Sequence, residues 1–114
     1  MASLQSLESL FGGKTAARVL LYIENYGEGY SRGISSTFEL SASQVQKQLR
    51  KLEDAGILVG TNAGKTRMYR WNDRDPSLKH LRLLLKETLE YGISKQDTAQ
   101  YFRQRSRPRK SGKE

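Results

Sequence analysis

A chain of 114 residues, of which 36% are apolar and 28% charged, predicts one globular domain. It contains no cysteine, which excludes disulfides, thiolate metal sites and cysteine nucleophiles, and no apolar run approaches the roughly 18 residues that a membrane span needs. The formal charge of +8 favours a polyanionic partner, although most of the excess lies in residues 103–113, so that residues 1–102 are only mildly basic.

Two helices are expected at the start of the chain. Three leucines at helical spacing predict a short amphipathic helix over residues 3–11, which Gly12-Gly13 ends. An apolar stripe over residues 14–25 predicts the second helix, and the glycines of residues 26–29 indicate a turn after it.

Two further helices are expected in the middle of the chain. Residues 31–38 have modest helix propensity, but Ile34 and Phe38 are four positions apart, which predicts a short helix held by tertiary packing. Ser41 is a good N-cap for the next helix, which Gly56 should end. The buried face of that helix is expected to consist of Val45, Leu49 and Leu52.

A hairpin and a long helix follow. Residues 57–61 and 66–71 favour extended structure, and Asn62-Ala63-Gly64-Lys65 between them predicts a β-hairpin. Asp75-Pro76 is expected to open a helix over Pro76–Tyr91, since proline suits a first helical turn. Residues 94–102 are expected to add a helical turn or two.

Three segments resemble bacterial and archaeal winged-helix regulators of the ArsR/MarR type. The segment LSASQVQKQLRKLEDAGIL at 40–58 resembles their recognition-helix block, and GKTRMYRWN at 64–72 resembles their wing tip and second wing strand. The segment LFGGKTAARVLL at 10–21 is similar to the start of the subset found near nucleotidyltransferase genes.

The resemblance covers about residues 10–91 and implies a fold and a domain plan. The fold is expected to be mainly α with a small β-hairpin wing: a winged helix-turn-helix with a three-helix core plus an N-terminal and a long C-terminal helix. Residues 1–92 are then the DNA-binding domain with its dimerisation helices. Residues 93–114 are expected to be a basic, largely disordered tail, because alternating Arg, Ser, Pro and Gly have nothing to bury.

The residue pattern agrees with DNA binding by the helix at 41–55. An α-helix fits the major groove, where Gln pairs with adenine, Lys reads guanine and Ser suits a base or a phosphate. Glu53 and Asp54 lie further along the helix, where they repel phosphate less. The side chains expected to face the DNA are Ser41, Ala42, Ser43, Gln44, Gln46, Lys47 and Arg50.

Contacts outside this helix are expected from three places. The wing should reach the flanking minor groove or the backbone with Asn62, Lys65, Thr66 and Arg67. A helix N-terminus favours a phosphate, which predicts contacts from Lys14, Thr15 and Arg18. The tail should follow the backbone or enter a narrow minor groove with Arg103, Arg105, Arg107 and Arg109.

An enzyme is not expected, and neither is a cofactor or a metal. Two Gly-Lys-Thr triplets lack the upstream glycine of a P-loop, since Glu8 and Val59 occupy that position. His80 is the single histidine, which with no cysteine is too little for a metal-sensing site. No nucleophile–base pair or spaced carboxylate pair is visible.

The expected partner is double-stranded DNA, bound by a homodimer at a near-palindromic site. The leucine stripe of residues 76–91 is wider than one small domain covers, so a two-fold interface is expected from Leu4, Leu7, Leu81, Leu85 and Leu89. A signal peptide is not apparent, which makes the cytoplasm, at the nucleoid, the expected location.

Two alternatives remain open from the residues. The first is a winged-helix protein-interaction module, such as an antitoxin or adaptor, with weak non-specific nucleic-acid binding. The second is an architectural protein whose tail supplies most of the affinity for nucleic acid. The identity of any protein partner is not indicated.

Overall fold

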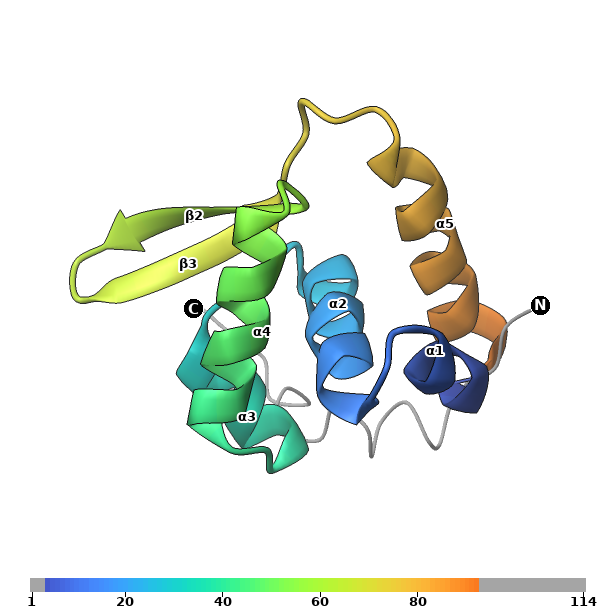
Figure 1. The fold of residues 1–114 in the computed structure, drawn as a ribbon, viewed down its shortest axis with the longest axis horizontal. Helices are drawn as coiled ribbons and strands as arrows, with labels where there is room; N and C mark the ends of the chain where they lie inside the picture. The colour runs from blue at the N-terminus through green and yellow to red at the C-terminus, as the bar shows by residue number, and fades with distance from the viewer. Residues whose placement is uncertain (1–3, 93–114) are drawn as a thin grey trace.

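The computed structural model describes residues 4–92, which form a helical body with a projecting β-hairpin (Figure 1). The predicted class, mainly α with a small β wing, is confirmed. In chain order the elements are α1 (Leu4–Leu10), α2 (Lys14–Tyr26), β1 (Glu28–Gly29), α3 (Ser31–Phe38), α4 (Ala42–Asp54), β2 (Leu58–Ala63), β3 (Thr66–Trp71), α5 (Leu78–Glu87) and a π-helical turn, η1 (Thr88–Gly92).

Helix α2 forms the centre of the body. Its apolar residues run nearly around the whole helix, and six of them are buried, as expected of a helix packed on several sides. It packs against α1, α4 and α5, so that α4 and α5 lie on opposite sides of it (Figure 1). The core therefore holds α4 in place without using the outer face of α4.

Helix α3 forms despite its weak local propensity because tertiary packing buries one side of it. Ile34 and Phe38 belong to the hydrophobic core, as the sequence predicted, and Thr37 satisfies its buried hydroxyl by donating to the carbonyl of Gly33 at 2.9 Å. The turn to α4 passes through Glu39, whose φ of +57° is in the left-handed region. Ser41 then caps α4 by accepting from the backbone N–H of Gln44 at 3.4 Å.

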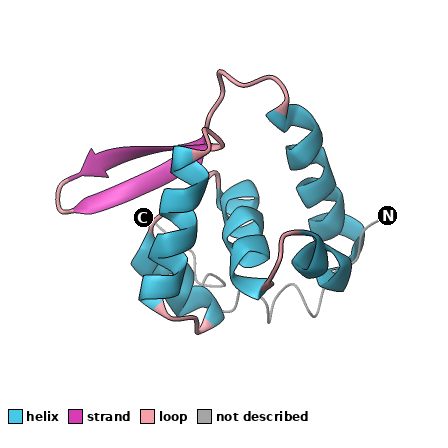
Figure 2. Ribbon diagram, viewed as in Figure 1, coloured by secondary structure: helices cyan, strands magenta, loops and turns pink. Residues whose placement is uncertain are grey.

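The sheet has the order β1-β3-β2 and is antiparallel throughout. Its two long strands form the hairpin that projects beside α4 (Figure 2). The short β1 occupies residues for which a turn was predicted, and Gly29 of β1 pairs with Tyr69 of β3. Two residues are too few to display strand alternation, so no local pattern predicts this strand.

The last helix is shorter than predicted at both ends. Residues 75–77 form a turn, in which Asp75 accepts from the backbone N–H and the hydroxyl of Ser77 at 3.0 and 2.6 Å, and α5 starts only at Leu78. At its other end α5 passes into η1 instead of continuing as an α-helix to Tyr91. The predictions for residues 94–102 and for the 93–114 tail lie outside the described residues.

Candidate nucleic-acid interface

Helix α4 presents a polar face opposite its buried one. Val45 and Leu49 are fully buried and Leu52 packs against the core, as predicted from their spacing. Six of the seven side chains predicted to face DNA are exposed: Ser41, Ala42, Ser43, Gln44, Lys47 and Arg50. Ser41 and Ser43 lie within hydrogen-bond distance of each other, with 2.9 Å between their hydroxyl oxygens.

The seventh side chain, Gln46, does not point outward as expected. It is half-buried, and its Nε2 donates to the hydroxyl of Tyr69 on β3 at 3.0 Å. The hydroxyl of Tyr69 thus finds its partner on α4, a pairing between residues 23 positions apart that helix spacing alone does not reveal. Gln46 joins α4 to the hairpin.

The hairpin closes with a tighter turn than predicted. Ala63 pairs with Thr66, which leaves only Gly64 and Lys65 in the loop, and Gly64 has a φ of +65°. A left-handed first turn residue suits a two-residue hairpin loop, and glycine adopts it without strain. Lys65 is therefore exposed at the tip of the wing.

Arg67 is held by the protein itself. One of its nitrogens donates to Glu53 of α4 at 2.5 Å, another donates to Asn62 Oδ1 at 2.9 Å, and its guanidinium lies 5.8 Å from the centroid of the Tyr69 ring. The carboxylate of Glu53 holds the pKa of Arg67 above its ordinary value. From the sequence, Glu53 was expected to lie away from the DNA, and no function was predicted for it. In the structure its carboxylate orients Arg67, which in turn contacts Asn62 on the wing.

The glycine at position 60 makes room for this arrangement. A Cβ on Gly60 would lie 2.7 Å from Nε of Arg67, closer than real contacts allow. Gly60, Asn62 and Arg67 lie on the same face of the hairpin as Tyr69, because side chains two apart on a strand share a face and the paired residues are directly opposite. That face is turned toward α4.

The N-terminus of α2 is less suited to phosphate than predicted. Lys14 is exposed and Thr15 half-buried, but Arg18 turns inward. Nε of Arg18 lies 3.8 Å from a carboxylate oxygen of Glu8, and its guanidinium is 5.8 Å from the centroid of the Phe38 ring. Arg18 is thus part of the α1–α2–α3 packing, and its contact with a phosphate stays a prediction. The four predicted tail arginines lie outside the described residues.

The half of the molecule formed by α3, α4 and the hairpin is rich in exposed cations. Six of them are exposed and form no ion pair within residues 4–92: Arg32, Lys47, Arg50, Lys51, Lys65 and Arg70. Of the carboxylates on α4, Glu53 forms an ion pair with Arg67. The uncompensated charge on this half is therefore positive, which attracts a polyanion.

The predicted dimer leucines do not form one surface. Leu7 and Leu85 are fully buried in the core of the single chain, which corrects their assignment to a dimer interface, while Leu4, Leu81 and Leu89 are half-buried. The large apolar side chains exposed on α1, α5 and η1 are instead Leu10 (67% exposed), Leu83 (52%) and Tyr91 (66%). Periodicity finds the apolar stripe, but it does not tell which leucines the chain's own core takes up.

Within residues 4–92 no three His, Asp or Glu side chains are grouped so as to hold a metal ion. His80 is exposed on α5. The same part of the chain contains no helix of the length and apolarity that crossing a membrane requires.

Known proteins resemble the chain in both sequence and fold. A sequence profile of the family described as "bacterial regulatory protein, arsR family" matches residues 13–58, which run from the start of α2 to the start of β2. Among solved structures, the AntR antimony-specific transcriptional repressor matches with a TM-score of 0.58 and 23% identity over 74% of each chain, a likeness that shows the fold. No match was found among curated proteins. The chain therefore has a winged helix-turn-helix fold, and its residues 13–58 are similar to regulatory proteins of the arsR family.

Proposed function

We propose that the protein is a homodimeric, sequence-specific regulator that reads a near-palindromic site in double-stranded DNA. Helix α4 enters the major groove, and the hairpin meets the flanking minor groove or the backbone. The single observation that carries the proposal is the exposed N-terminal half of α4, where Ser43, Gln44 and Lys47 are free of the core while Val45 and Leu49 anchor the helix.

Lys65 and Arg67 of the wing are proposed to have different functions. Lys65 at the tip is exposed and forms no ion pair within the described residues, which suits a backbone contact. Arg67 is tied to Glu53 and so fixes the wing relative to α4 before it meets DNA. A prearranged wing loses less conformational entropy on binding than a mobile one.

Dimerisation is proposed through the side of the molecule opposite α4. Helices α1 and α5 lie there (Figure 1), and Leu10 and Tyr91 expose apolar surface at this side. A two-fold axis would place two copies of α4 about one DNA turn, roughly 34 Å, apart, which requires a near-palindromic site. Replacing Leu10 and Tyr91 together by Ser should lower the mass in sedimentation equilibrium from twice 13.0 kDa to 13.0 kDa.

Residues 93–114 are proposed to add affinity without specificity, as an extension to the DNA-binding domain of residues 1–92. Six cations at positions 103–113 would release counterions from DNA and steepen the salt dependence of binding. Deleting residues 103–114 should therefore flatten the salt slope and keep the sequence preference. A protein with this function is proposed to act in the cytoplasm, at the nucleoid, with no catalytic activity.

Selection from a random duplex pool at physiological salt tests the proposal. An enriched near-palindrome supports it and gives the spacing of the two copies of α4. The alternative, a protein-interaction module, gains some support from the exposed Leu10 and Tyr91. That alternative predicts no enriched sequence and a stable complex with a different chain.

A further inference from the structure

The guanidinium of Arg67 lies against the wing instead of extending into solvent. One of its terminal nitrogens donates to Glu53 on α4 at 2.5 Å, and the other donates to Asn62 Oδ1 at 2.9 Å. Its Nε lies over Gly60, since a Cβ at that position would be only 2.7 Å away. Both terminal nitrogens of Arg67 are therefore engaged by the protein before any DNA is bound.

The carboxylate of Glu53 occupies the place on Arg67 that a phosphate would take. A guanidinium presents its N–H groups as a planar fork, and carboxylate and phosphate oxygens bind that fork in the same way. A phosphate would therefore have to displace Glu53, Asn62 or both. The side chain of Arg67 is 40% exposed, so the loss of Glu53 would leave its guanidinium accessible to a phosphate.

Neighbouring cations are not held in this way. Four of them on α4 and the wing tip are exposed and form no ion pair within residues 4–92: Lys47, Arg50, Lys51 and Lys65. Lys65 is only two positions from Arg67 on the same hairpin. The wing thus has one cation that is open to phosphate and one that is engaged by α4.

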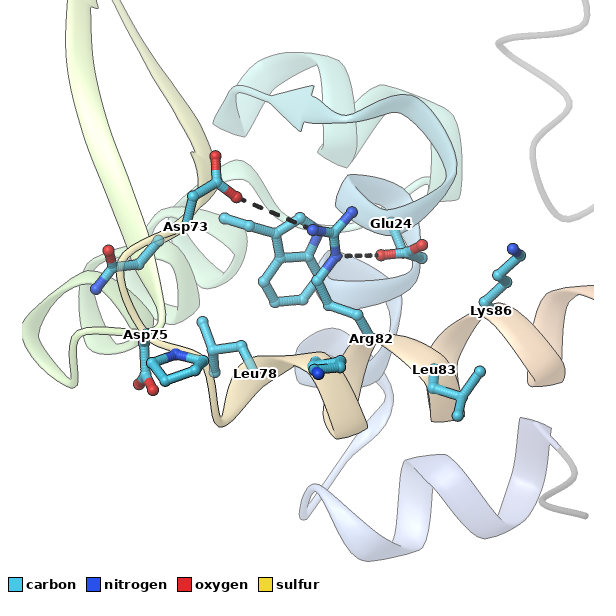
Figure 3. Close-up of a pocket in the computed structure, with 11 residues that line it drawn as sticks. Glu24, Asp73, Asp75, Leu78, Arg82, Leu83 and Lys86 are labelled. Atoms are coloured by element: carbon cyan, nitrogen blue, oxygen red, sulfur yellow. Dashed lines mark hydrogen bonds and ion pairs between the residues drawn. The ribbon is translucent and has the colours of Figure 1, made fainter.

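A second arginine is paired with a carboxylate on the opposite side of the molecule. Nε of Arg82 on α5 donates to Glu24 of α2 at 3.0 Å, and its guanidinium lies 5.5 Å from the centroid of the Trp71 ring, at the base of the hairpin (Figure 3). Helix α2 separates α5 from α4 (Figure 1), so this pair lies away from the proposed DNA contacts. It provides an internal comparison for the pair at the wing.

We infer that Glu53 weakens sequence-independent DNA binding by keeping Arg67 from the phosphates. The inference rests on the proposed function in that α4 and the wing face DNA. With Glu53 present, Lys65 contacts the backbone from the wing and Arg67 does not. Without Glu53, Arg67 gains a phosphate contact, which strengthens binding to a duplex of any sequence.

This restraint raises the discrimination between a specific site and other DNA. A phosphate contact carries no sequence information, and non-specific sites greatly outnumber the specific ones. In a specific complex α4 is fixed in the major groove, and Arg67 emerges from the hairpin face that is turned toward α4. In a non-specific complex the protein is not held in one orientation, so a released Arg67 reaches a phosphate more easily there. Glu53 is thus a specificity-determining residue that acts without contacting DNA itself.

The test measures how the binding of the full chain to a duplex of random sequence depends on salt. Fluorescence anisotropy gives the slope of the logarithm of the binding constant against the logarithm of the salt concentration, and each phosphate contact steepens this slope by about 0.9. Glu53→Gln should steepen it by about 0.9 and tighten binding about fivefold at physiological salt. Arg67→Gln should keep the wild-type slope, and so should the variant that carries both substitutions. An unchanged slope in Glu53→Gln, or a flatter one in Arg67→Gln, overturns the inference.

Two control variants remove a carboxylate elsewhere. Asp54→Asn makes the same change of charge one residue further along α4, at an exposed side chain that forms no ion pair within the described residues. Glu24→Gln releases Arg82 on the side away from α4. Both controls should keep the wild-type slope. A control that steepens the slope as much as Glu53→Gln would show that the position of Glu53 beside Arg67 is irrelevant, and would overturn the inference.

A selected duplex tests the effect on specificity. Glu53→Gln should tighten binding to this duplex less than binding to the random one, so that the ratio of the two affinities falls. An equal gain on both duplexes would overturn the assignment of specificity to Glu53. If the protein selects no duplex, the proposed function fails, whereas the slopes on random DNA still decide whether Glu53 keeps Arg67 from the phosphates.

Discussion

Nε2 of Gln46 on α4 donates to the hydroxyl of Tyr69 on β3 at 3.0 Å, so the wing is bound to the helix that is proposed to read DNA. Seven residues along α4, Glu53 forms the second link by accepting from Arg67 of the same strand. Two polar contacts on one side of the hairpin thus set its angle to α4. The geometry of the interface depends on them as well as on the core.

The hydrogen bond between Gln46 and Tyr69 should make a measurable contribution to the stability of the fold. Tyr69→Phe keeps the buried ring and removes the hydroxyl, which should lower the free energy of unfolding by about 1 kcal/mol and the melting temperature by several degrees. Tyr30→Phe is the matched control, because Tyr30 is exposed and lies outside the proposed dimer surface. Thermal unfolding of both variants measures the difference, and equal melting temperatures would show that the contact contributes nothing.

The second contact should be weak and sensitive to salt. Arg67 and Glu53 are both partly exposed, so solvent screens the pair and its contribution to stability is small. A double-mutant cycle with Arg67→Gln and Glu53→Gln should give a favourable coupling energy at low salt and a smaller one at 1 M salt. A coupling energy that does not change with salt would argue against an ion pair at this position.

Two glycines flank Tyr69 in the sheet and should respond differently to the same substitution. A Cβ on Gly29 would lie 2.9 Å from the buried Tyr22 ring, and Gly29→Ala should cost about 1–3 kcal/mol because the core cannot give way. A Cβ on Gly60 meets only the end of Arg67, which is a flexible side chain. Gly60→Ala should therefore cost less than Gly29→Ala, because it disturbs only a partly exposed ion pair. Denaturant unfolding of the two variants compares them, and a greater loss for Gly60→Ala would contradict this packing.

The turn before α5 predicts a dependence of stability on pH. Hydrogen bonds from the hydroxyl and the backbone N–H of Ser77 lower the pKa of Asp75 from its ordinary value of 3.8. A lowered pKa in the folded state gives stability that is present above pH 3.8 and is lost as the pH falls through the folded-state value. Asp75→Asn should melt below the wild type at pH 7, and the difference should shrink below pH 3.8. A difference that is constant from pH 7 to pH 3 would contradict the assignment.

The sequence predicted most of the fold because its signals are local. Ser41 as N-cap, Gly56 after the helix and the spacing of Val45 and Leu49 define α4 without any tertiary information. Gly64 likewise predicted the hairpin, though with a longer loop. The short β1 escaped prediction because it depends on β3, a partner strand distant in the chain. The late start of α5 escaped prediction because it depends on a turn of three residues.

The site was harder to predict than the fold. Exposed positions on α4 follow from helical spacing, but Gln46, Arg18 and Glu53 have partners on other elements, and only the packing decides where their side chains go. Packing also decides which leucines are left for a dimer surface. Leu7 and Leu85 satisfy the pattern of an interface and that of a core equally well, and the structure places them in the core.

The proposal that α4 reads bases is tested most directly by a ratio of affinities. Because Gln46 is bound to Tyr69, the variant to use is Gln44→Ala combined with Lys47→Ala, and Arg74→Ala, in the segment between β3 and α5, is the matched control. Fluorescence anisotropy at physiological salt gives the Kd for a selected duplex and for a scrambled one. The account predicts that the ratio of the two falls at least about tenfold in the double variant and is kept in the control. A double variant that binds both duplexes more weakly but retains the wild-type ratio would contradict base readout by α4.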